Sequence, residues 1–249
     1  MSGHSHWATI KHKKSAVDAK RGKLWSKLAK AIIVAAKHGG GDPDQNLRLR
    51  YAIDDAKANS VPKDNIQRAI KTGTGELAGD NLEEIIYEGS AGGVAVVCEI
   101  LTNNRNRTAP EIRKLFELSG GKLGSTNCVL WMFENKGLFL VPGDSIGEEK
   151  LMEVALEAGA EDIKTEGETF EIFTDPTNFE AVRTALVAKN IETVSAEITM
   201  IPASTVKVEG SDAKNLLGLI ELLEENEDIQ HVHANFDISD EEMAKLAEE

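Results

Sequence analysis

Glutamate is missing from the first 75 residues of this 249-residue chain, although Asp and Glu together number 42. The same 75 residues contain 11 Lys and 4 Arg against 6 Asp, a net charge of +9. The other 174 residues contain 13 basic and 36 acidic side chains, a net charge of −23. A division this sharp suggests that one part of the chain attracts a polyanion while the other provides solubility.

Cysteines and long apolar runs are also scarce. The two cysteines, Cys98 and Cys128, each lie within an apolar segment. We therefore expect both to be reduced and buried in the core of a cytoplasmic protein. No run of about 18 apolar residues exists, so no membrane-spanning helix and no membrane partner are expected.

Patterns that would indicate catalysis are missing as well. The glycines at 39–41 lack the Lys-Ser/Thr ending of a phosphate loop and follow a helical pattern rather than a strand. No Ser–His–Asp or Cys–His arrangement is found. Ser2-Gly3-His4 behind a free amine could bind Cu(II) or Ni(II), but a chance histidine is far commoner, and His6 and His12 have no matching partner. The acids at 221–228 are interpreted as a solvated helix end. We expect no enzyme, no metal and no cofactor.

The N-terminal residues carry a helical pattern. Residues 15–38 repeat apolar side chains at intervals of three, four or seven, and Ser15 with Asp18 resembles a capping box. Asp42, followed by Pro43, predicts the start of a second helix. Pro62 opens a third helix, so residues 1–75 are predicted to form a basic domain of three helices.

The rest of the chain alternates strand and helix patterns. Residues 137–201 follow the order βαββαβ, which is that of a ferredoxin-like fold. A second set in the same order is predicted from the strands 93–101, 128–133, 205–209 and 229–236 and the helices 108–118 and 213–225. The fold class is therefore α+β, with two ferredoxin-like domains, one inserted into the other. The predicted boundaries are 76–134 plus 203–249 for the outer domain and 135–202 for the insertion.

Basic side chains of the first helix form a row beside its apolar face, within an arc of roughly 100°. Such ammonium groups bind phosphates without reading sequence, although a solvated helix face is the alternative. Arg105 and Arg107 precede Thr108, the predicted cap of the next helix, and would suit a phosphate there. The candidate nucleic-acid-binding residues are Lys11, Lys13, Lys14, Lys20, Lys23, Lys27, Lys30, Arg48, Arg50, Arg105 and Arg107.

Four long motifs resemble the YebC family: "SGHSHWATIKHKKSAVDAKRGKLWSKLAKAI", "GGGDPDQNLRLRYAIDDAKANSVPKDNIQRAIKTGTG", "YEGSAGGVAVVCEILTNNRNRT" and "SGGKLGSTNCVLWMFENKG". The resemblance spans essentially the whole chain. It departs from the family pattern at His6 (usually Lys), Leu47 (usually Pro) and Asn127-Cys128 (usually Gly-Ser).

The resemblance implies a helical first domain, two α+β domains and a cytoplasmic factor in gene expression. Family members are described as probable DNA-binding transcriptional regulators. The mitochondrial relative is a translational activator of cytochrome c oxidase, and bacterial relatives are linked to stalled ribosomes. The sequence therefore favours a non-enzymatic DNA-binding regulator of transcription. The alternative is a ribosome-associated translation factor that binds ribosomal RNA or tRNA. A protein partner for the acidic domains is unknown.

Overall fold

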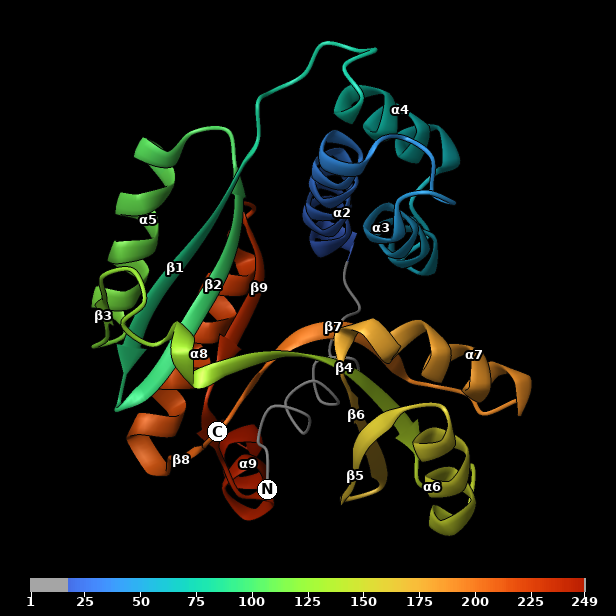
Figure 1. The fold of residues 1–249 in the computed structure, drawn as a ribbon. Helices are drawn as coiled ribbons and strands as arrows, with labels where there is room; N and C mark the ends of the chain where they lie inside the picture. Colours follow the sequence, from blue (N-terminus) through green and yellow to red (C-terminus); the bar gives the residue numbers. More distant parts are fainter. Residues whose placement is uncertain (1–17, 249) are drawn as a thin grey trace.

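The structure, a computed structural model, describes residues 18–248. Three helices come first, followed by two four-stranded antiparallel sheets with their own helices (Figure 1). The predicted α+β fold class is thereby confirmed. Within the described residues, no helix combines the length and apolar character needed to cross a membrane.

The helical unit packs three helices around a small apolar core. Its buried residues include Ile32, Leu49 and Ala56, which are all fully enclosed. The three helices are α2 (Asp18–Gly39), α3 (Leu47–Ala58) and α4 (Lys63–Gly73).

The second helix does not start at Asp42, so that prediction is wrong. Asp42 instead accepts a hydrogen bond from the backbone N–H of Asp44 in a turn, and Asn46 caps α3. The side-chain oxygen of Asn46 accepts from the Leu49 N–H at 3.1 Å, while its amide donates to the Ala35 carbonyl at 2.8 Å. Asn46 rather than Asp42 caps α3, because an amide both accepts and donates hydrogen bonds. It can therefore cap α3 and donate to α2, whereas a carboxylate only accepts.

Gly73 lets the end of α4 lie close against α2. A Cβ there would lie 2.4 Å from the Ile33 carbonyl oxygen and 2.7 Å from Ala36 Cβ. Gly73→Ala should therefore force the helices apart and lower the free energy of unfolding by about 1–2 kcal/mol in urea titrations. Gly22→Ala is the control, because an added Cβ on this exposed position of α2 meets nothing within 4 Å. Gly22→Ala should raise the free energy of unfolding by about 0.5–1 kcal/mol, because alanine favours the helix. Equal losses of stability at Gly22 and Gly73 would contradict this explanation.

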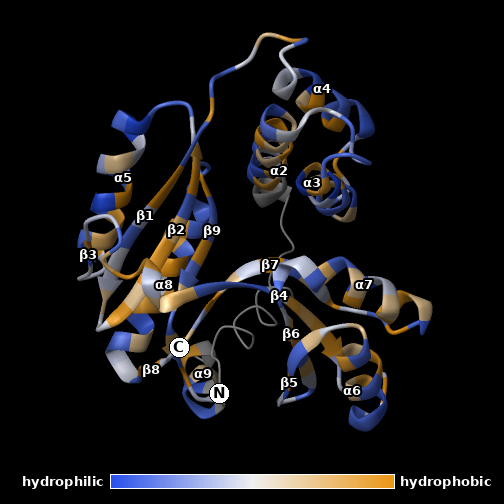
Figure 2. Ribbon diagram, in the orientation of Figure 1, coloured by the Kyte–Doolittle hydropathy of each residue, from blue (hydrophilic) through white to orange (hydrophobic). Residues whose placement is uncertain are grey.

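The first sheet has the strand order β3-β1-β2-β9. One face is covered by two helices, whose Ile112, Phe116 and Leu219 are buried against Val96 and Cys98 of the central strand. Figure 2 shows apolar colour along the central strands. The elements of this unit are β1 (Glu83–Ala91), β2 (Val94–Thr102), α5 (Arg105–Leu118), β3 (Lys122–Leu123), α8 (Gly210–Glu225) and β9 (Ile229–Ala234).

The second sheet has the order β5-β6-β4-β7 and confirms the βαββαβ pattern expected over 137–201. Its core includes Phe139 and Phe179, whose rings stack at 4.6 Å between centroids. Its elements are β4 (Phe133–Pro142), α6 (Glu148–Glu157), β5 (Ala160–Glu166), β6 (Thr169–Thr174), η2 (Pro176–Asn178), α7 (Phe179–Ala188) and β7 (Ser195–Pro202). The first and last strands of this unit, β4 and β7, pair with each other, so the chain enters and leaves it at one place. We therefore propose the boundaries 135–202 for this domain and 76–134 plus 203–249 for the outer one.

The outer unit repeats this strand layout by an unexpected route. The predicted strand 205–209 is not in its sheet, since β8 (Val206–Lys207) pairs instead with β10 (Phe236–Asp237) just before α9 (Asp240–Glu248). In the sheet, β1 takes the position that the third strand of the βαββαβ order was predicted to fill, although β1 precedes the other strands in the chain. β1 forms a hairpin with β2 through Gly92 and Gly93, whose φ angles of 57° and 81° suit a tight two-residue turn.

The predicted strand 128–133 is also wrong. It forms a short 3₁₀ helix, η1 (Leu130–Met132), before β4 begins. The carboxylate of Glu88, 3% exposed, accepts the backbone N–H groups of Asn127, Val129 and Leu130 at 2.5, 2.8 and 2.8 Å. Burial opposes ionisation of Glu88, but these hydrogen bonds prevail and lower its pKa.

Two side chains of the segment 127–132, which Glu88 holds in place, are exposed to solvent. The Trp131 side chain, on η1, has a relative exposure of 75%. Cys128 is also exposed, contrary to the prediction, whereas Cys98 is buried as predicted. The error at Cys128 follows from interpreting this segment as a buried strand.

Candidate nucleic-acid interface

The α2 lysines contact the C-terminal end of α8, about 200 residues further along the chain. Lys23 Nζ lies 3.5 Å from the Glu225 carbonyl oxygen, and Lys27 Nζ donates to the Glu224 carbonyl at 2.6 Å. Lys30 Nζ donates to the Glu227 carbonyl at 3.0 Å and to Asp228 Oδ1 at 2.7 Å. The structure thus brings three of the predicted lysines onto one small surface, and that surface belongs to the same chain.

The C-terminal end of α8 is stabilised by cations from α2, because its own sequence has none there. The last carbonyls of a helix lack partners within the helix and carry partial negative charge. α8 has no basic residue in its last turn. Glu224, Glu225 and Glu227 add further negative charge there. The α2 lysines therefore act as the C-terminal cap of α8.

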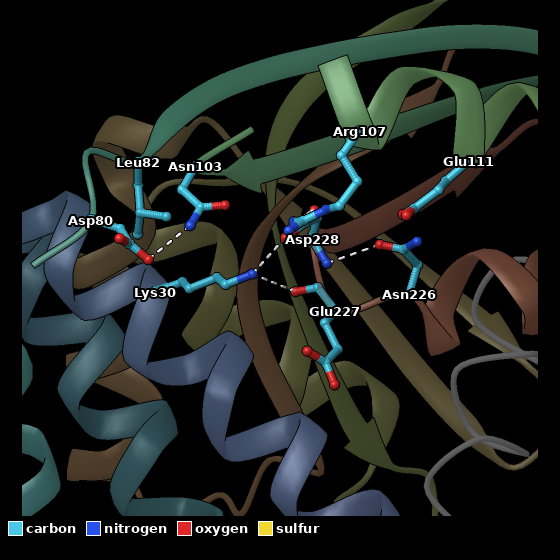
Figure 3. Close-up of a pocket in the computed structure, with 9 residues that line it drawn as sticks. All are labelled: Lys30, Asp80, Leu82, Asn103, Arg107, Glu111, Asn226, Glu227 and Asp228. Atoms are coloured by element: carbon cyan, nitrogen blue, oxygen red, sulfur yellow. Dashed lines mark hydrogen bonds and ion pairs between the residues drawn. The ribbon is translucent and has the colours of Figure 1, made fainter. Parts of the chain in front are cut away.

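Asp228 is the centre of this interface and is only 4% exposed. Its Oδ2 accepts hydrogen bonds from Arg107 at 2.6 Å, from Thr108 Oγ1 at 2.7 Å and from Thr102 Oγ1 at 3.1 Å. Figure 3 shows Lys30 and Arg107 reaching it from α2 and from α5. Burial opposes ionisation, but the donors, Lys30 foremost, outweigh it and hold the pKa of Asp228 at about 2.

A polar cavity of about 430 Å³ adjoins Asp228. Its walls alternate in charge, with Lys30 and Arg107 close to Asp80, Glu111 and other acids (Figure 3). Among the described residues, no group of three or more His, Cys, Asp or Glu side chains could hold a metal ion. The interface therefore offers charged donors and acceptors rather than an enclosed ligand site.

The interpretation of residues 221–228 as a solvated helix end is wrong for Asp228. The sequence places Asp228 beside four glutamates, which gives no sign that one carboxylate is buried. One signal was available, since α8 ends in acids without a basic residue while α2 carries excess lysines.

The predicted arginines are mostly engaged within the protein. Arg48 pairs with Glu84, and Arg50 donates to the Pro43 carbonyl at 3.1 Å. Arg105 is exposed and Arg107 is bound to Asp228. The cap of α5 is Asn104, whose side chain accepts from the Arg107 N–H, and the predicted cap Thr108 is buried within the helix.

The remaining predicted lysines cannot be placed at this interface. Lys11, Lys13 and Lys14 lie outside the described residues. Lys20 is part of α2, but its side chain is not among those described. A second basic surface, which the prediction missed, lies on α4. Its side chains Lys63, Arg68 and Lys71 are exposed and make no ion pair within residues 18–248.

The protein thus combines a basic three-helix unit with two α+β units. Lysines of the helical unit contact the first α+β unit, and the candidate site is the charged surface between them. Family models agree with this architecture: the TACO1/YebC protein N-terminal domain matches residues 5–76, and the TACO1/YebC second and third domain matches residues 82–236. The chain belongs to the TACO1/YebC family.

Curated relatives and a solved structure match nearly the whole chain. A probable transcriptional regulatory protein of Geobacter sulfurreducens is 57% identical over 247 residues, covering 99% of this chain and all of the relative. One of Natranaerobius thermophilus with the same name is 55% identical, covering 96% and 98%. The crystal structure of a conserved hypothetical protein from Aquifex aeolicus matches with a TM-score of 0.84 and 47% identity, over 94% of this chain and 98% of that one.

Proposed function

We propose that this protein is a non-enzymatic, nucleic-acid-binding regulator of gene expression in the cytoplasm, and specifically a DNA-binding regulator of transcription. The observation that carries the proposal is the charge division, +9 over residues 1–75 against −23 over the rest. The names of the full-length relatives, probable transcriptional regulatory proteins, support the same role.

The proposed contacts are phosphate contacts. Lys11, Lys13 and Lys14 and the row on α2 would bind the backbone, with the arginines at 48, 50, 105 and 107 in support. Ammonium groups neutralise phosphates and release counterions without selecting a base sequence. If seven lysines each met a phosphate, the slope of log K against log salt would be roughly −6 on duplex DNA.

Binding by the full-length protein to a duplex of about 30 base pairs tests these contacts. Lys23→Gln/Lys27→Gln/Lys30→Gln should weaken binding roughly 30-fold near physiological salt, because three phosphate contacts are lost. The matched control is Lys63→Gln/Arg68→Gln/Lys71→Gln, which removes the same charge from α4 and should cost less than about fivefold. A larger loss in the control would place the binding surface on α4 instead.

The alternative is a translation factor that uses the same lysines on ribosomal RNA. It is favoured by the nature of the α2 row, which offers amines for phosphates and no amides arranged to read base edges. Crosslinking in cells, followed by sequencing of the bound nucleic acid, separates the two. Promoter DNA that is lost in the Lys23/Lys27/Lys30 variant supports transcription, whereas ribosomal RNA moves the assignment to translation.

A further inference from the structure

We propose that nucleic acid and the C-terminal end of α8 compete for the same lysines, so that binding separates the helical domain from the first sheet. This inference rests on the proposed function. It assigns to residues 224–228 the role of an internal competitor that keeps the protein closed until nucleic acid is present.

The contact geometry opposes binding of nucleic acid along the row of α2 lysines while α8 is docked on them. The ammonium groups of Lys23, Lys27 and Lys30 lie between α2 and the end of α8, with contacts of 2.6 to 3.5 Å. A duplex, whose major groove alone is about 12 Å wide, cannot enter such a seam. Phosphates can therefore reach these lysines in a row only after α2 has moved away from α8.

The end of α8 offers the same chemistry as a nucleic-acid backbone. Four carboxylates, those of Glu224, Glu225, Glu227 and Asp228, occur within five residues. Backbone carbonyls add acceptors: those of Glu224 and Glu225 in the last turn of α8, and that of Glu227 just beyond it, already bind α2 lysines. Both partners are thus anionic and rich in acceptors, and both would draw on the ammonium groups of the same three lysines.

Few apolar contacts hold the closed state at this seam. Val34 of α2 packs with Leu82 and Leu101 in a small buried cluster, and Lys37 donates to Asn81 at 2.6 Å. A separate contact joins α3 to α7, where Tyr51 donates to Glu180 at 2.9 Å. Contacts between domains of this polar kind commonly open and close.

Neutralising the competitor should strengthen binding to the duplex of about 30 base pairs. Glu225 and Glu227 are exposed, so Glu225→Gln/Glu227→Gln removes two charges without disturbing the core. Their contacts with Lys23 and Lys30 are through backbone carbonyls, which these substitutions keep. Only the negative charge beside the lysines is removed, so we expect binding to tighten about threefold. Glu149→Gln/Glu153→Gln on α6 removes the same charge elsewhere and should change affinity less than twofold. Equal effects of the two pairs would overturn the competition.

A distance measurement tests the opening directly. Spin labels at Asn65→Cys on α4 and Glu117→Cys on α5 report the separation, in a Cys128→Ser background because Cys128 is exposed. Saturating duplex should lengthen the distance between the labels. Binding with an unchanged distance overturns this inference and leaves the proposed function intact. Failure to bind either DNA or RNA overturns both.

Discussion

Asp228→Ala should lower the free energy of unfolding by about 3 kcal/mol in urea titrations. The carboxylate accepts four hydrogen bonds, from Lys30, Arg107, Thr102 and Thr108. Removing it leaves two cations without their partner and two buried hydroxyl groups with one acceptor fewer. The loss is large because the side chain joins α2, α5 and the turn after α8 at one point.

The neighbouring acid provides the control for this effect. Glu227 is exposed, and its interaction with Lys30 is through its backbone carbonyl. Glu227→Ala should therefore change the free energy of unfolding by less than about 0.5 kcal/mol. Equal losses at positions 227 and 228 would show that general charge, and not the buried carboxylate, stabilises this interface.

Acid should abolish the contribution of Asp228 in a defined range. Its pKa of about 2 lies below the ordinary 3.8, so the unfolded chain binds the proton more tightly. The stabilisation is therefore complete above about pH 5 and is lost as the pH falls towards 2. The difference in unfolding free energy between the native protein and Asp228→Asn should shrink by about 2 kcal/mol across this range. A constant difference would contradict the lowered pKa.

Glu88→Ala should cost about 2–3 kcal/mol and act on one segment. The substitution removes the acceptor of the Asn127, Val129 and Leu130 backbone N–H groups. Hydrogen exchange at these three amides should therefore accelerate far more than exchange in β2. Glu84→Gln is a matched control on the same face of β1, where the partner Arg48 is exposed, and it should cost less than about 1 kcal/mol. Unchanged exchange at the three amides would contradict this role for Glu88.

The fold was predictable where the pattern is local and strong. The periodicity of α2 and the βαββαβ order of the second sheet could both be derived from the sequence. β1 was missed because the acids Glu84 and Glu88 interrupt its apolar residues, so its sequence resembles a linker. The segment 128–133 was misassigned because an apolar run also suits a 3₁₀ turn, and only the buried Glu88 decides between them.

The candidate site was predictable as a set of residues but not as a place. Spacing along α2 predicted that Lys23, Lys27 and Lys30 share one side, and all three do reach the end of α8. That their partner lies about 200 residues away could not be inferred, because no local pattern relates the two segments. For the same reason, Arg107 was interpreted as a phosphate ligand while its partner Asp228 was interpreted as solvated.

The chain enters the second sheet at Phe133 and leaves it at Pro202, and these two residues face each other in the ladder between β4 and β7. Just outside them, the Ala203 N–H donates to the Met132 carbonyl at 2.8 Å. The two ends of a 70-residue excursion are therefore one hydrogen bond apart. During folding, the pairing of β4 with β7 brings the ends of this segment together. The outer unit can therefore form without a further entropic cost of closing a 70-residue loop. In evolution, an excursion with adjoining ends can be gained, lost or exchanged while the sheet that it interrupts stays in register.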